Sequence, residues 1–219
     1  GAALGEGLRL ISIGLLARPT DKTLAKLAQE TQNRLNQIVD GTYEALPTGK
    51  NEDVDALIRA ASFHKVHGNH ELALIFIERA CRAEFDKNGP TSKDYAIFLW
   101  QKGTIQRVAG HYEEAITTIQ KAKRLFSKHE NPKPDLIAHC MNSEAVCRAT
   151  LNEFEKALVL LSEAIEVLNG SDEEYLYLKS LITANLPLCG EAYGDRDKQI
   201  FAYQTAIQLH EKSGVNEPW

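Results

Sequence analysis

The sequence predicts an all-α solenoid of stacked helical hairpins, and three regularities in its 219 residues support that prediction. Turn-forming residues recur 42 residues apart, small residues recur at the same spacing, and the apolar residues between them follow the helical period. A constant period of this length is typical of stacked supersecondary units, because each unit buries its apolar face only against its neighbours.

The composition fits a folded helical chain and disfavours several classes of function. Hydrophobic residues make up 43% of the chain, and it contains only 7 prolines, so an extensive core is available. The net charge of −5 gives no electrostatic reason to bind nucleic acid or an anionic membrane. The longest apolar run, residues 8–16, is interrupted by Arg9 and is too short to span a bilayer. We therefore expect a cytoplasmic protein that neither binds nucleic acid nor inserts into a membrane.

The period is carried by three sets of markers. The turn markers are Gly68, Gly110, Asn152 and Gly194. A second set of small residues is Ala80, Ala122, Ala164 and Ala206. A third set is Ala61, Gly103, Ala145 and Pro187, in which the last member breaks the pattern. Four units therefore follow one another, and the fourth is irregular.

Each unit is expected to contain two antiparallel helices. In the second unit, apolar spacing predicts a first helix near residues 93–109 and a second near 112–127. The turn between them, at residues 110–111, is so short that the two helices must run antiparallel. Breaker segments separate successive units at residues 87–90, 131–134 and 169–172.

The first 50 residues do not keep the period. An apolar stripe formed by Leu24, Leu27, Thr31, Leu35 and Ile38 predicts a helix over about residues 21–39. A shorter helix is expected before it, so residues 1–50 are predicted to be a helical hairpin that caps the solenoid. The chain begins with Gly-Ala rather than Met, and we expect it to be a processed or excised fragment.

The spacing of small residues resembles the tetratricopeptide (TPR) repeat. Gly at the turn followed by Ala-x6-Ala, as in Ala115 and Ala122, is similar to the TPR pattern, although the usual period is about 34 residues. The 42-residue variant resembles the arrays of kinesin light chain and of Rap-type peptide-sensing regulators. The resemblance covers about residues 54–213 and implies a right-handed TPR-like solenoid.

On this basis, residues 51–215 are expected to form four repeats. Their approximate bounds are 54–95, 96–137, 138–179 and 180–213. The fourth repeat departs from the pattern, because Pro187 replaces a small residue and Gln199 replaces the first alanine of the second helix. Its first helix is therefore expected to be kinked.

No group of residues makes a convincing catalytic site. Glu113 and Glu114 lie beside His111, but acidic residues recur at the same helix starts in all four units, where they complement the helix dipole. The three histidines His64, His67 and His70 have a spacing that suits zinc, yet packing and turn positions explain them better. No catalytic residue, metal site or cofactor is therefore predicted.

Two further sets of residues also receive structural interpretations. The four cysteines are expected to be buried, reduced thiols, because none of them forms a C-x-x-C pair. A cationic group in the second unit is interpreted as a solvated helix face. Its members are Lys121, Lys123, Arg124 and Lys128.

The expected functional site is the concave face, which the first helix of each unit lines in such solenoids. Aligning the units places one row of candidate partner-binding residues on this face. They are Arg59, Lys65, Trp100, Gln101, Arg107, His139, Asn142 and Asn185. Trp and Arg are common binding anchors, and the amides offer hydrogen bonds to a peptide backbone. The alternative is that Trp100 packs against the next unit and the rest is ordinary surface.

The predicted function is a non-catalytic scaffold or adaptor that binds a protein or peptide in this groove. The cations on the face suggest that the partner carries an acidic segment. The carboxylate clamp of chaperone-binding TPR domains is absent at the matching positions, so that function is not inferred. One alternative is a peptide- or ligand-sensing regulatory domain of a larger signalling or transcription-regulating protein. Homodimerisation through an end unit is a further alternative.

Overall fold

The computed structural model describes Lys26, residues 53–169 and residues 174–215. Within these ranges the chain is helical and contains no strand. The α-helices are α3 (Val54–Val66), α4 (His70–Asn88), α5 (Lys93–Val108), α6 (Tyr112–Lys128), α7 (Pro134–Thr150), α8 (Phe154–Val167), α9 (Leu176–Asn185) and α10 (Arg196–Ser213). A 3₁₀ segment, η1 (Leu186–Ala192), separates α9 from α10. The predicted hairpin at residues 1–50 lies outside the described residues.

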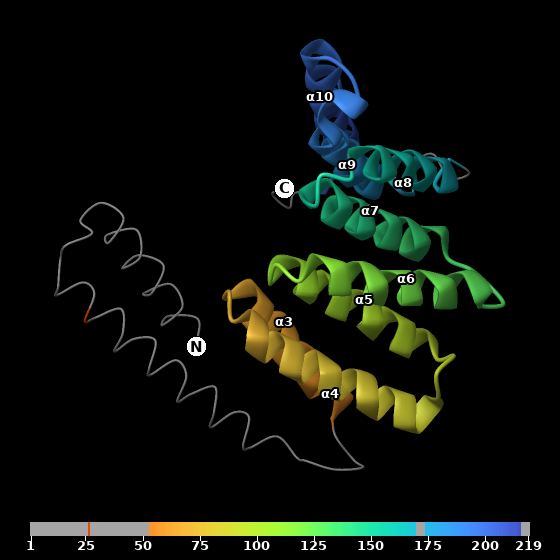
Figure 1. The fold of residues 1–219 in the computed structure, drawn as a ribbon. Helices are drawn as coiled ribbons and strands as arrows, with labels where there is room; N and C mark the ends of the chain where they lie inside the picture. The colour runs from red at the N-terminus through yellow and green to blue at the C-terminus, as the bar shows by residue number, and fades with distance from the viewer. Residues whose placement is uncertain (1–25, 27–52, 170–173, 216–219) are drawn as a thin grey trace.

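The helices pack as successive pairs, which confirms the all-α solenoid. Each of α3, α5, α7 and α9 packs most extensively on the helix that follows it, and Figure 1 shows the pairs stacked in chain order. We call these four the A helices, and we call α4, α6, α8 and α10 the B helices. The expected second-unit helices end within one residue of their predicted bounds. In the structure Ser92 caps the start of α5, and Gly110, one of the predicted turn markers, lies in the turn after it.

The turn markers share a positive φ. Gly68, Gly110 and Gly194 have φ values of 76°, 87° and 149°, and Asn152 has a φ of 61°. Among the described residues, Asn152 is the one non-glycine residue with positive φ. Only glycine, and to a lesser degree asparagine, adopts positive φ without a large steric cost. The period in the sequence therefore records the backbone geometry that reverses the chain between an A and a B helix.

We expect Gly110→Ala to lower the free energy of unfolding by about 1–2 kcal/mol, because a Cβ is disfavoured at positive φ. A Cβ at this position would have no atom within 4 Å, so the loss would come from the backbone alone. Asn152→Gly is the matched control, and its effect should stay within about 0.5 kcal/mol because the same conformation remains accessible. Urea unfolding measures both variants. Equal stability of Gly110→Ala and the wild-type protein would contradict the conformational explanation.

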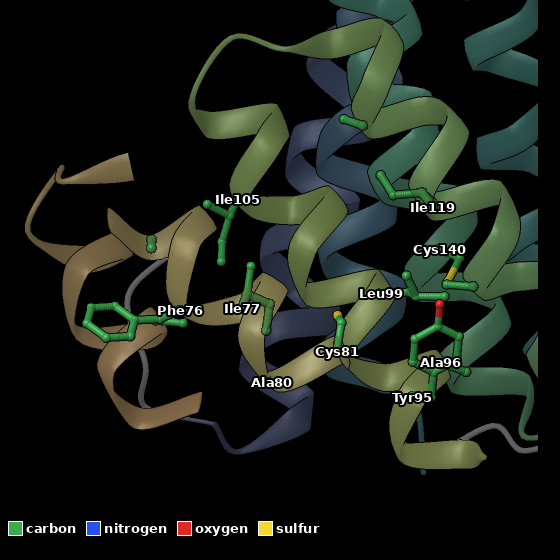
Figure 2. Close-up of a cluster of buried hydrophobic side chains, with 14 of the residues drawn as sticks. Phe76, Ile77, Ala80, Cys81, Tyr95, Ala96, Leu99, Ile105, Ile119 and Cys140 are labelled. Atoms are coloured by element: carbon green, nitrogen blue, oxygen red, sulfur yellow. The ribbon is translucent and has the colours of Figure 1, made fainter. Parts of the chain in front are cut away.

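The core between the paired helices consists of two clusters of buried side chains, one centred on the first two pairs and one on the last two. Ala73, Ala115 and Ala157, near the start of successive B helices, are all fully buried. The second set of small residues, Ala80, Ala122, Ala164 and Ala206, is 0–1% exposed. Figure 2 shows larger buried side chains of the cluster in the first two pairs, including Phe76, Ile77, Leu99, Ile105 and Ile119. Small residues thus set how closely the helices approach, and large ones occupy the remaining volume.

Helices α5 and α6 approach each other closely at Gly103 of α5. A Cβ built there would stand 2.5 Å from Ile119 Cγ1 and 3.3 Å from the carbonyl oxygen of Ala115. Ile119 is fully buried, so its side chain has little room to move aside. The glycine in the third marker set is therefore required by packing rather than by φ.

The fourth pair is broken where the sequence predicted a kink. Helix α9 ends at Asn185, and η1 begins with Leu186 followed by Pro187. Gly190 within this segment has non-helical dihedrals (φ 55°, ψ −135°). Proline removes a backbone donor and disfavours helical geometry in the residue before it, so the regular helix stops there. Gln199 donates to the carbonyl oxygens of Gly190 (3.2 Å) and Gly194 (3.0 Å), which satisfies acceptors that the break exposes.

All four cysteines are free and buried, as expected from the sequence. Burial raises the pKa of the Cys81 and Cys140 thiols to about 12. It raises the pKa of Cys147 and Cys189 to about 11. Each thiol is therefore protonated at neutral pH and is a weak nucleophile, which fits a packing role.

Candidate partner-binding surface

The A helices α5, α7 and α9 lie closer together than the B helices. Helix α5 contacts α7 and α7 contacts α9, whereas no two successive B helices in the described ranges make a comparable contact. The stack therefore curves with its A helices on the inner side, where the predicted groove residues of α5, α7 and α9 are located.

Trp100 lies at the junction of α5 and α7. Its indole Nε1–H donates to Ser143 Oγ (3.3 Å), and its ring centroid is 5.1 Å from that of His139. The side chain is half-buried, so Trp100 packs on the next A helix while it keeps part of its surface exposed. The alternative that Trp100 packs against the next unit therefore holds for one side of the ring, and the rest of the side chain remains partly exposed.

The next junction along the same face joins two predicted residues. Asn185 Nδ2 of α9 donates to Asn142 Oδ1 of α7 over 2.8 Å. Both Asn142 and Asn185 are half-buried. The amide pair and the Trp100–Ser143 pair each join positions 43 residues apart, so one row of polar contacts runs along the A helices. In this pairing, Asn142 keeps its donor group and Asn185 keeps its acceptor group for other partners.

The remaining residues of α5 and α7 lie near this row. Arg107 stands two helical turns after Trp100, on the same face of α5, and is half-buried. Gln101 is half-buried beside Trp100. Burial lowers the pKa of His139, and the nearby Asp135 carboxylate acts in the opposite direction. The His139 imidazole is therefore neutral at pH 7, and the positive charge near Trp100 comes from Arg107.

The two predicted residues of α3 are not joined to this row. Arg59 is exposed and lies 4.0 Å from the Asp53 carboxylate, and Lys65 is half-buried in the last turn of α3. Within the described residues, neither side chain forms a hydrogen bond or ion pair with α5, α7 or α9. The structure thus brings together Trp100, His139, Asn142 and Asn185, and leaves the cations of α3 apart from them.

The histidines and glutamates that were considered for catalysis or metal binding make packing and hydrogen-bond contacts with neighbouring side chains. His64 is 3% exposed and stacks on Phe76 at a centroid distance of 5.4 Å. His67 stacks on Phe63 at 4.1 Å. Glu114 accepts from Gln106 Nε2 (3.3 Å) in the first turn of α6. No three His, Cys, Asp or Glu side chains within the described ranges are grouped to hold a metal ion.

Two charged features were not recognised from the sequence. Glu144 of α7 is buried, with its side chain 3% exposed, and lies 3.5 Å from Lys123 Nζ. Lys123 therefore belongs to an ion pair rather than to the solvated face expected for it, while Arg124 and Lys128 are exposed. Lys121 lines a cavity with other cations from α4 and α5. Comparing charges at positions 42 residues apart would have drawn attention to both features.

Comparisons with known proteins identify the fold but no family. No protein-family model matches the chain, and no curated protein matches it. A similar solved structure is the crystal structure of BtubC (BKLC) from P. vanneervenii, a kinesin light chain-like TPR-type protein. The TM-score is 0.64 at 14% sequence identity, over 100% of this chain and 92% of that one. This likeness supports the all-α helical solenoid. None of the described helices is long and apolar enough to cross a membrane.

Proposed function

We propose that this protein is a non-catalytic interaction scaffold whose inner A-helix face binds a segment of a partner protein. The row from Trp100 to Asn185 carries this proposal, because it combines a half-buried aromatic ring with amides that offer hydrogen bonds. Large aromatic rings set among polar groups are frequent anchors in protein interfaces. TPR-like solenoids present such concave surfaces to extended or helical segments, which supports the same assignment.

The partner segment is expected to be acidic where it passes α5. Arg107 provides a cation on the groove side of this helix, and the neutral His139 adds none. Carboxylates of the partner would therefore be steered toward Arg107, while the peptide backbone would hydrogen-bond to the amides of Asn142 and Asn185. Arg59 and Lys65 of α3 would attract the same segment at longer range, and this part of the effect is screened by salt.

Trp100→Ala is expected to weaken retention of the partner by at least about tenfold, which corresponds to roughly 1.4 kcal/mol of lost anchoring. An affinity pull-down that quantifies bound proteins for wild-type and variant chains measures this effect. The variant should remain folded, since the indole is only half-buried, and circular dichroism checks this.

Phe201→Ala is the matched control, because Phe201 is an aromatic residue of α10 that is 65% exposed outside the A-helix face. Loss of a protein from the Trp100→Ala sample but not from the Phe201→Ala sample supports the groove. If the same proteins bind in equal amounts to all three chains, the groove assignment is wrong.

A further inference from the structure

The B-helix side of the solenoid contains a cavity between the first two described pairs. Helices α4 and α6 spread apart over α5, and the space between them has a volume of about 610 Å³. Its walls come from α4 and α6, and its floor comes from Tyr95, Leu99 and Lys102 of α5. The cavity lies on the opposite layer from the proposed groove, so its role is independent of the proposed function.

Cations dominate the lining of this cavity. Five of them surround it, and Glu78 is the one carboxylate among the lining residues. The cations are Arg79, Arg82, Lys102, Lys121 and Arg124. Such an excess of positive charge is unexpected on a chain with a net charge of −5. Charges of one sign in a hollow focus the electrostatic potential and concentrate ions of the opposite sign.

Internal contacts use only some of these charges. Lys102 forms an ion pair with Glu78 at 2.7 Å. Lys121 Nζ donates to Tyr95 Oη (3.0 Å) and lies 5.2 Å from the centroid of that ring. Arg82 and Arg124 are exposed and have no ion pair to a described residue. These two guanidinium groups stand on opposite walls, and Thr117 and Thr118 add hydroxyl groups on the α6 wall.

The repeat itself provides a comparison for this charge pattern. Forty-two residues after Lys121 and Arg124, the corresponding positions of α8 hold Glu163 and Glu166. The counterpart of Lys102 is Glu144. The fold therefore does not require cations at these positions, and the third unit has the opposite charge at each of them.

We propose that the cavity between α4 and α6 binds a multiply charged phosphate group. Guanidinium groups match the tetrahedral oxygens of phosphate with paired hydrogen bonds, and the Thr118 hydroxyl can donate to a remaining oxygen, whereas the Thr117 hydroxyl already donates to the carbonyl oxygen of Glu113. The apolar floor formed by Leu99 and the Tyr95 ring would contact an organic part of the ligand. The phosphate belongs either to a small organic molecule or to a phosphorylated side chain of a partner.

Isothermal titration calorimetry with inorganic tripolyphosphate and with a phosphoserine peptide tests this proposal. We expect at least one of the two probes to bind the wild-type protein, and the double variant R82Q/R124Q to weaken that binding by about tenfold. The matched control is K87Q/K128Q, which removes the same charge from the last turns of the same two helices. It should change the affinity by less than about twofold, because neither lysine lines the cavity.

The two probes distinguish the sources of the phosphate. Binding of tripolyphosphate that depends on Arg82 and Arg124 supports a small phosphorylated ligand, and such binding of the peptide supports a modified partner. Absence of binding by both probes overturns the proposal. Equal weakening by the two double variants also overturns it, because the effect would then reflect net charge alone. An otherwise identical peptide with glutamate in place of phosphoserine, if it bound equally well, would contradict the preference for phosphate.

Discussion

Replacing Glu144 with alanine is expected to lower the free energy of unfolding by about 3 kcal/mol, because it removes the acceptor of a buried charged network. Glu144 Oε1 accepts from Gln120 Nε2 (2.8 Å) and from Arg148 Nε (2.9 Å) and Nη2 (2.7 Å). The side chains of Lys123 and Arg148 are only 25% and 17% exposed, so losing the carboxylate leaves cations that are poorly solvated. Arg148 keeps its contact with Glu153 at 2.6 Å, which limits the loss.

Chemical unfolding in urea, followed by circular dichroism, measures this change. Glu155→Ala is the control, because Glu155 is an exposed carboxylate in the first turn of α8 and should contribute no more than about 1 kcal/mol. A loss below 1 kcal/mol for Glu144→Ala would mean that water replaces the carboxylate. Because Gln120 and Lys123 belong to α6 and Glu144 belongs to α7, the variant should mainly weaken the contact between the second and third pairs.

Gly103→Leu is expected to cost about 3 kcal/mol, near the upper end of overpacking effects. Leucine is a much better helix former than glycine, so helix propensity alone would predict a gain of stability. The steric argument predicts the opposite sign, since even a Cβ would lie 2.5 Å from Ile119 Cγ1. Helices α5 and α6 would have to separate, and the contacts of Ala115 and Ile119 with α5 would be lost.

A double-mutant cycle with Ile119→Ala tests the steric cause. Ile119→Ala alone should cost about 2–5 kcal/mol, because Ile119 is fully buried. Together with Gly103→Leu, its cost should be less than additive by about 1–2 kcal/mol, as the new side chain fills the vacated space. Ser127→Leu, on the exposed face of α6, is the control for an added leucine and should be nearly neutral. Strict additivity in the cycle would exclude the clash as the cause.

The sequence predicted the helices and turns closely, and it predicted the functional surfaces only in part. The turn at Gly110 and the break at Pro187 could be predicted because each depends on backbone dihedrals within a few residues. The buried alanines could be predicted because each of the four units needs a small side chain at the same place, where its two helices pack closely.

Contacts between neighbouring units could not be predicted from these local sequence patterns. Sequence spacing placed Trp100 and His139 on one face, but their ring contact depends on the offset between α5 and α7. The same interpretation took Lys121 and Lys123 together as solvated. Lys121 is exposed at the rim of a cavity, but Lys123 pairs with buried Glu144. The apolar periodicity of a helix specifies which of its sides is apolar. It does not specify which charged group of the next unit a side chain on the polar side contacts.

The sequence by itself therefore determined the period, the helix ends and the all-α solenoid, since these follow from local backbone preferences repeated every 42 residues. Only the tertiary structure decided that α5 meets α7 and α7 meets α9, while the B helices of the described ranges stay apart. That difference joins Asn142 to Asn185 along the inner face and opens the cationic cavity on the outer one. The physical reason is that side-chain volumes from three helices at once set the spacing of neighbouring units, and no single repeat contains that information.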